Sequence, residues 1–420
     1  MRFNSNHYCM KSQAFFLSLF SSICLVSFGQ NGEFQQFARY QDSMMMKAYY
    51  AKDAKNYITA LNVFDTRFNS LSKEEKENYK NYRINSYYNL ACTYSLLNDK
   101  KNAMAFFKKS IEAGYTNYAH IQEDTDLDNI RKEDEFQKLI QPLREVGDYL
   151  YILKKAGKYN VEEKQDLPKF VYQSADNSNL VALRKAFNLD SIAGHANEVS
   201  KILNLMHWVH NLIPHDGNHN NPVVKNALSM IQECKRDARG LNCRGMATVL
   251  NECYLAMGIK SRFVTCLPKD SLGVDPDCHV INMVYSTELK KWLWIDPTFD
   301  AYVMNEKGQL LGMEEVRERI INDQPLILNP EANWNHKVSE TKEYYLYNYI
   351  AKNLYMLECP ISSEYDTETS AAGKTISYVR LIPLDYFKKS IEKGVSTNNL
   401  TKTTMTTYRT NNPSFFWQAP

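Results

Sequence analysis

The stretch from Leu241 to Thr298 decides the fold. It reads LNCRGMATVLNECYLAMGI over 241–259, CHVINMVY over 278–285 and WLWIDPT over 292–298. Apolar residues recur at helical spacing after Cys243 until Gly258, and Asn242 is a typical cap residue, so we expect a helix that begins at Cys243. The runs 259–266, 279–285 and 292–295 have the composition of strands. The stretch therefore predicts an α+β domain in which a helix packs against an antiparallel sheet.

Three residues of this stretch suggest chemistry. His279 opens its predicted strand and Asp296 closes the next one, so a hairpin with its turn near Glu288 places them directly opposite each other or nearly so. A carboxylate beside an imidazole fixes its tautomer and supports its charged form, which in turn stabilises a cysteine thiolate. Cys243 sits where the helix dipole lowers the pKa of a thiol and where free N–H groups can hold an oxyanion. Taken alone, Cys243 could equally be a small buried side chain.

Together these motifs resemble the transglutaminase-like domain of the papain-like superfamily, over about residues 180–302. The resemblance implies that Cys243 is a nucleophile, His279 a general base and acid, and Asp296 the carboxylate that orients the histidine. It also implies a papain-like core with the nucleophile helix packed on an antiparallel sheet. Such families use an upstream Gln or Trp as a second oxyanion donor. Trp208, the only upstream Trp, is the candidate here.

Further residues near the motifs are candidates for the oxyanion site or the cleft: Trp208, Asn242, His215, Asp216 and Arg244. Arg244 is either solvated or binds a substrate carboxylate. A rival hypothesis makes the polar cluster a metal site, with His207, His210, His215, Asp216 and His219 as ligands. Because this spacing matches no familiar site, we expect a polar loop beside the cleft, with no metal, no calcium and no other cofactor.

The N-terminus resembles a secretory signal over 1–29. Lys11 precedes an uncharged apolar run from Ala14 to Phe28, and small residues lead to a cleavage site near Gly29. A start at Met10 would give a more compact signal. A membrane anchor would need a longer run, and the residues before Cys24 fit a lipid-attachment site poorly. We therefore expect export to the periplasm or the extracellular space, with no integral membrane segment after cleavage.

Charge and cysteine counts narrow the classes of function. The formal charge is +2, and Arg2 and Lys11 account for the excess, so the chain after the signal is neutral. Neutrality gives no electrostatic reason to expect nucleic acid as a partner. Of nine cysteines, Cys9 and Cys24 lie in the signal. The odd number that remains leaves at least one free thiol in an oxidising compartment.

A second sequence pattern lies N-terminal to the stretch 241–298. Residues 87–115 read YYNLACTYSLLNDKKNAMAFFKKSIEAGY, with a turn at Asn98-Asp99 and Gly114 as a left-handed cap. We expect two helices that approach closely at small residues, with Tyr94 and Phe107 filling the seam. The pattern resembles a tetratricopeptide repeat, with a weaker copy around Ala60 and Phe64. A plain helical hairpin is the alternative. A short repeat array suggests a docking surface for a protein partner.

The predicted organisation is a signal peptide at 1–29, a repeat-like helical domain at 30–150, a junction at 151–179, a transglutaminase-like domain at 180–335 and an extension at 336–420 packed on the core. Helices are expected over 180–188, 197–212, 314–322 and 340–357, and a strand over 376–382. Three functions fit. They are a peptidase or amidase acting on protein or peptide through a thioester, a protein-crosslinking transglutaminase, and an inactive scaffold that binds partners through its repeats.

Overall fold

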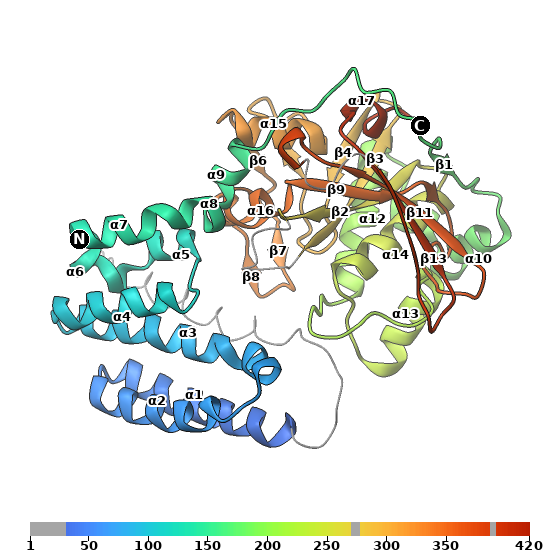
Figure 1. Ribbon diagram of the computed structural model, residues 1–420. Coiled ribbons are helices and arrows are strands. Elements are labelled where there is room, and N and C mark those ends of the chain that lie inside the picture. The colour runs from blue at the N-terminus through green and yellow to red at the C-terminus, as the bar shows by residue number, and fades with distance from the viewer. Residues whose placement is uncertain (1–30, 270–277, 387–391) are drawn as a thin grey trace, which may run out of the picture. The chain divides into compact units, whose positions relative to one another are not determined.

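The computed structural model describes residues 31–269, 278–386 and 392–420. It consists of two compact units (Figure 1). The first contains residues up to 115 and 123–139, and the second contains 116–122 and 140–420. The predicted signal peptide over 1–29 and most of the predicted loop after Pro268 lie outside the described residues. None of the described helices combines the length and apolar character needed to cross a bilayer.

The first unit is helical. Two helical hairpins are formed by α1 (Asn31–Tyr50) with α2 (Ala54–Asn69) and by α3 (Lys73–Leu96) with α4 (Lys100–Glu112), followed by η2 (Thr125–Leu127), α6 (Asp128–Arg131) and α7 (Asp134–Ile140). Asn98 turns the chain with a φ of +60°, and Asp99 caps α4 by accepting from the N–H of Asn102. Gly114 has a φ of +111°, as a left-handed cap requires.

Aromatic rings fill the seam of the second hairpin, as predicted. Tyr94 stacks on Phe106, with ring centroids 5.6 Å apart, and Phe107 lies against Tyr88 of α3 at 6.5 Å and also packs on Phe136 at 4.5 Å. One residue is about 100° of helix rotation, so Phe106 and Phe107 face different neighbours. Phe107 therefore ties the repeat to the short helices that follow it.

The second unit contains a seven-stranded sheet with the order β12-β13-β11-β9-β2-β3-β4. Its strands are β2 (Ser261–Leu267), β3 (His279–Ser286), β4 (Lys291–Ile295), β9 (Met356–Pro360), β11 (Thr375–Leu381), β12 (Lys393–Thr397) and β13 (Thr404–Thr410). All neighbours are antiparallel except β11 and β13. Short pairs flank it: β1 (Val171–Tyr172) with β10 (Ser362–Ser363), β5 (Val303–Met304) with β6 (Ile327–Leu328), and β7 (Asn333–Trp334) with β8 (Val338–Ser339). The α+β prediction is confirmed.

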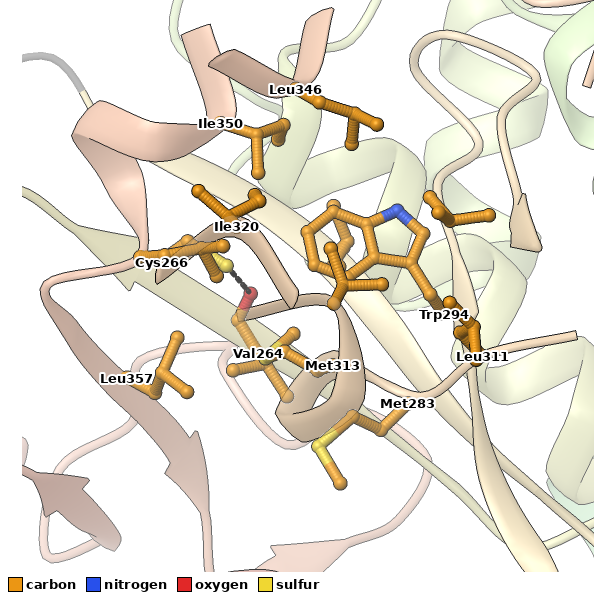
Figure 2. Packing of buried hydrophobic residues seen from close by; sticks show 14 of the residues in the cluster. Val264, Cys266, Met283, Trp294, Leu311, Met313, Ile320, Leu346, Ile350 and Leu357 are labelled. Carbon is orange, nitrogen blue, oxygen red and sulfur yellow. Dashed lines mark hydrogen bonds between the residues drawn. The ribbon is translucent and has the colours of Figure 1, made fainter. Parts of the chain in front are cut away.

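Helices cover both faces of this sheet (Figure 1). On one face lie α10 (Ser178–Phe187), α11 (Leu189–Ala193), α12 (Glu198–Leu212), α13 (Ala227–Asp237) and α14 (Cys243–Ala256). On the other lie α9 (Tyr149–Lys154), α15 (Met313–Ile321), the π-helix η5 (Glu343–Ile350) and α16 (Ala351–Asn353). Trp292 and Trp294 join the second core, whereas Leu293 and Ile295 join the first, as the alternation of a strand requires. Figure 2 shows Ile320, Leu346 and Ile350 around Trp294.

Two predicted boundaries change. The helix expected over 340–357 ends at Asn353, and Met356–Pro360 forms strand β9 between β2 and β11. A short apolar run that is buried on both faces carries no period with which to tell a strand from a helix. The division between units falls near residue 140 instead of 150. Leu153, in the predicted junction, is packed in the core of the second unit.

The C-terminal residues complete the same sheet instead of forming a separate extension. Four of its seven strands come from residues after 355. Phe416, in the last helix α17 (Pro413–Phe416), is fully buried, and its carbonyl accepts a hydrogen bond from the guanidinium of Arg262 at 3.0 Å. The remaining short elements are α5 (Tyr118–Glu123), η3 (Gln141–Leu143), α8 (Arg144–Gly147) and η6 (Leu384–Tyr386).

Candidate active site

Cys243 is the first residue of α14. Asn242 caps the helix by accepting from the backbone N–H of Gly245 at 3.2 Å. Asn221 fixes the cap, since its side-chain oxygen accepts from the Asn242 N–H at 3.0 Å and its NH₂ donates to the Asn242 side chain at 2.6 Å. A Cβ at residue 245 would lie 2.6 Å from that Asn221 oxygen, so this position requires Gly. Asn242 therefore orients the helix start, with its side-chain oxygen engaged as an acceptor.

His279 and Asp296 form a buried pair. His279 Nε2 lies 2.7 Å from Asp296 Oδ2, and neither side chain is exposed to solvent. The same carboxylate accepts from the hydroxyl of Tyr345 at 2.7 Å and, through Oδ1, from the N–H of Thr298 at 2.9 Å. Because both carboxylate oxygens are engaged, Asp296 has a fixed orientation toward the imidazole.

The pairing of the two strands differs from the prediction by two residues. The last pair of the β3–β4 ladder is Asn282 with Ile295, so Asp296 comes level with Ile281 and diagonal to His279. A shift of two residues keeps every side chain on its face. The histidine and the carboxylate consequently still meet, although they are not directly opposite each other.

The thiol and the imidazole perturb each other. Burial alone would raise the pKa of Cys243, but hydrogen bonds from His215 and His279 and the charge of the His279 ring lower it to about 6. Burial would lower the pKa of His279, but the charge and hydrogen bond of Asp296, and then Cys243, raise it to about 10. The two shifts run in opposite directions, and both favour a thiolate beside an imidazolium.

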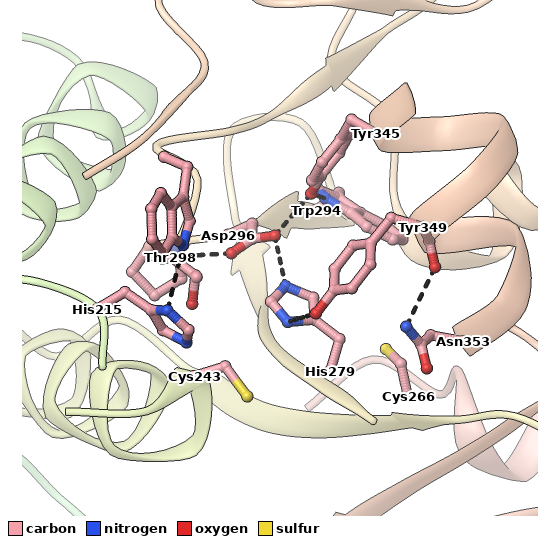
Figure 3. Close-up of polar contacts among 12 residues, drawn as sticks. His215, Cys243, Cys266, His279, Trp294, Asp296, Thr298, Tyr345, Tyr349 and Asn353 are labelled. Atoms are coloured by element: carbon pink, nitrogen blue, oxygen red, sulfur yellow. Dashed lines mark hydrogen bonds and ion pairs between the residues drawn. The ribbon is translucent and has the colours of Figure 1, made fainter. Parts of the chain in front are cut away.

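His215 lies on the opposite side of Cys243 from His279 (Figure 3). The indole N–H of Trp334 donates to His215 Nδ1 at 3.2 Å. An indole N–H can only donate, so Nδ1 must be the acceptor and the ring proton is on Nε2. Asn335 holds the backbone, accepting from the His215 N–H at 2.6 Å and donating to its carbonyl at 2.9 Å. His215 thus presents an N–H donor to the sulfur.

The other predicted residues have different places. Arg244 is partly exposed, and its guanidinium pairs with Glu368 at 2.7 Å and donates to Thr265 at 2.8 Å, so these two partners engage its side chain. Trp208 packs against Phe187 of α10, with ring centroids 5.6 Å apart, so its aromatic surface serves the helical core. Sequence spacing alone could not distinguish the two faces of α12.

The polar cluster does not converge on one point. Each member has its own partner: His207 pairs with Asp300, His210 with the carbonyl of Pro297 and with Asn333, His215 with Trp334, and His219 with Asp216. These separate contacts do not support the metal hypothesis. Asp216 instead lines an open cavity of about 480 Å³ together with His219, Asn220, Ala238, Arg239 and Gly240. Asp216, which lines this cavity, follows His215 directly in the sequence.

Two tyrosines of η5 complete the surroundings of the pair. Tyr345 reaches Asp296, and Trp294 in turn donates to the Tyr345 hydroxyl at 3.1 Å. The hydroxyl of Tyr349 lies 3.2 Å from His279 Nδ1 (Figure 3). Neither tyrosine was predicted from the sequence, and neither was Trp334. For the two tyrosines, the only indication in the sequence was the high tyrosine content of residues 343–350. That content does not show which face of the helix points to the site.

Two segments of the chain match known protein families. Residues 185–297 match the model of the transglutaminase-like superfamily, and residues 84–113 match the tetratricopeptide repeat. A chloroplast protein of Arabidopsis thaliana is 26% identical over 111 residues, which is 26% of this chain and only 31% of that protein. A crystal structure of a provisionally assigned cysteine protease from Cytophaga hutchinsonii aligns with 21% identity and a TM-score of 0.23, over 33% of this chain and 46% of that chain.

Proposed function

Since residues 185–297 form a transglutaminase-like domain, which is typical of cysteine-dependent enzymes, we propose that this protein is a thiol-dependent acyl-transfer enzyme. We further propose that it acts as a peptidase or amidase through a Cys243 thioester. The observation that carries the proposal is the buried 2.7 Å contact between His279 Nε2 and Asp296, which leaves the other ring nitrogen for reaction. A pKa of about 6 for Cys243 supports it, because the thiolate is the reactive form.

In the first half-reaction, the Cys243 thiolate attacks the carbonyl carbon of an amide. A carbon–sulfur bond forms and the carbonyl electron pair moves to oxygen. The Nε2–H of His215 and the backbone N–H groups at the start of α14 are the donors available to that oxyanion. His279 Nδ1–H then protonates the leaving amine as the carbon–nitrogen bond breaks, and a thioester remains.

In the second half-reaction, neutral His279 accepts a proton from water through Nδ1 as the water oxygen attacks the thioester. The carbon–sulfur bond breaks, the acid leaves, and the thiolate–imidazolium pair is restored. Asp296 stabilises the positive charge that forms on the ring in each step. Attack by a primary amine would use the same groups and would make the protein a transglutaminase.

The proposal also covers the substrate of the protein and its location. The tetratricopeptide repeat at 84–113 suggests protein–protein interaction, so we propose a protein or peptide substrate and a protein partner for the helical unit. We also propose export by the N-terminal signal. Fractionation of cells that express the full chain, compared with a chain starting at Gln30, tests the second point.

The test of the catalytic proposal is direct detection of the thioester. Incubation with p-nitrophenyl acetate, followed by intact mass measurement at low pH, should show one acetyl group per chain, located on Cys243 and removed by hydroxylamine. Cys243→Ser and His279→Ala should show none on that timescale. Acetylation that is equally fast in His279→Ala would contradict the proposal. A product mixture with added glycine amide tells hydrolysis from transamidation.

A further inference from the structure

We propose that the hydroxyl of Tyr349 positions the nucleophile that resolves the acyl-enzyme, and that it thereby defines the acceptor side of the cleft. This inference rests on the acyl-transfer function proposed above. It concerns a residue outside the segment that matches the superfamily model, which ends at 297.

The imidazole has only one nitrogen left for chemistry. Nε2 of His279 is bound to Asp296 at 2.7 Å, so every proton that enters or leaves the reaction must pass through Nδ1. The Tyr349 hydroxyl is 3.2 Å from this Nδ1. A nucleophile that His279 deprotonates must lie within about 2.6–3.2 Å of the same nitrogen. It approaches the edge of the ring at which the Tyr349 hydroxyl already lies, so that hydroxyl is a candidate to hold it.

The position of Tyr349 is well determined by its neighbours. Its ring packs edge-on against His279, with centroids 5.1 Å apart, and against Phe299 at 5.4 Å. Phe299 also contacts His279 at 5.6 Å, so the three rings support one another. The Tyr349 carbonyl accepts from the side chain of Asn353 at 3.1 Å, one turn further along the chain. This hydroxyl is held in place, as a positioning group requires.

The hydroxyl is on the correct side of the imidazole for this task. Tyr349 reaches Nδ1 of His279 from η5, whereas Cys243 comes from the start of α14, and His215 lies on the far side of Cys243 from His279 (Figure 3). The His215 donor to the oxyanion is therefore separated from the Tyr349 hydroxyl. A hydroxyl both donates and accepts, so it can accept one hydrogen of a water or amine whose other hydrogen points to Nδ1. That arrangement orients the lone pair of the nucleophile for attack.

The two half-reactions should therefore respond differently to loss of this hydroxyl. Attack by Cys243 needs no external nucleophile, so Tyr349→Phe should leave the acylation rate within about twofold. Deacylation should fall by about threefold to tenfold, the range expected for one lost hydrogen bond. Acyl-enzyme would then accumulate, and KM would fall together with kcat.

The experiment is burst kinetics of the full chain with p-nitrophenyl acetate. Tyr349→Phe should release one equivalent of nitrophenol at the rate of the unmodified protein and then turn over more slowly. Hydroxylamine, which attacks a thioester without a general base, should restore turnover. Tyr347→Phe on the same helix serves as the control, and thermal melts of both variants check folding.

Two outcomes overturn the inference. Equal slowing of acylation and deacylation would show that Tyr349 only orients the imidazole. An unchanged deacylation rate would show that Tyr349 does not act on the resolving nucleophile. A burst that is absent from the unmodified protein would instead refute the acyl-transfer proposal itself, which distinguishes the two failures.

Discussion

Single residues of the site were predictable where chemistry and local spacing agree. Cys243, His279 and Asp296 follow from a helix start and a hairpin, both of which are local patterns. The groups that surround them come from far along the chain. Trp334 orients His215 across 119 residues, and Tyr349 reaches His279 across 70. No periodicity reports such contacts, because they depend on how separate elements pack.

His215 offers a test at this scale. His215→Ala should raise the pKa of the Cys243 thiol, because it removes a hydrogen bond that stabilises the thiolate. If His215 also serves the oxyanion, acylation should slow on the order of a hundredfold. Stopped-flow acylation by p-nitrophenyl acetate over a range of pH measures both effects.

The matched variant is Trp334→Phe. It leaves His215 present but removes the N–H that fixes its tautomer, so a smaller loss of about threefold to tenfold is expected. Equal rates for His215→Ala and the unmodified protein would show that the ring faces the sulfur without helping the reaction.

The pH dependence of turnover follows from the two shifted groups. Below about pH 6 the Cys243 thiol is protonated and cannot attack. Above about pH 10 the His279 imidazolium loses its proton and no acid remains for the leaving group. A bell-shaped profile of kcat/KM for an amide substrate is expected between these limits, which belong to the coupled pair. A profile that begins to rise only near pH 9 would contradict the assignment.

At the scale of elements, the start of α14 and the register of the hairpin show how far sequence reasoning reaches. The cap at Asn242 was visible because capping is local. The register was predicted two residues away from the observed pairing of Asn282 with Ile295. A turn of uncertain length leaves that freedom, and a shift of two residues keeps every side chain on its own face of the sheet. The π-helix η5 was not foreseen, since its distinction from an α-helix lies in packing.

The cap formed by Asn242 leads to a prediction about the stability of α14. Asn242→Ala should lower the free energy of unfolding by about 1 kcal/mol, because an orphan N–H loses its acceptor. Asn242→Asp keeps an acceptor and should retain most of the stability. Its negative charge next to Cys243 should nevertheless raise the pKa of the thiol. Urea denaturation and thiol titration separate these effects, and equal stability of all three proteins would contradict the capping argument.

At the scale of the molecule, the second unit extends well beyond the part that resembles known domains. The superfamily match ends at 297, but β9, β11, β12 and β13 occupy the middle and one edge of the sheet. Arg262 is fully buried among Phe170, Trp292 and Phe416 and binds the carbonyl of Phe416. One of these strands and the packing of the aromatic end were predicted from the sequence. Both were assigned to an extension, because strand partners far apart in sequence leave no local signal.

This architecture predicts the effect of truncation. A chain that ends at Asn335 keeps the predicted transglutaminase-like segment but loses four of the seven strands of the large sheet, together with Tyr345 and Tyr349 of η5. We expect it to lack a cooperative thermal transition and near-ultraviolet circular dichroism. A chain that starts at Ile140 keeps all seven strands and should unfold cooperatively. A sharp thermal transition in the chain that ends at Asn335 would show that the sheet does not depend on its last strands.

The central claim is that His279 and Asp296 hold Cys243 as a thiolate, and alkylation by iodoacetamide as a function of pH tests it most directly. Labelling of Cys243, identified by peptide mass, should reach half its limiting rate near pH 6 in the unmodified protein. In His279→Ala this midpoint should move up toward the ordinary value of a thiol, about 8.5. A midpoint near 8.5 in the unmodified protein, unchanged by His279→Ala, would contradict the account.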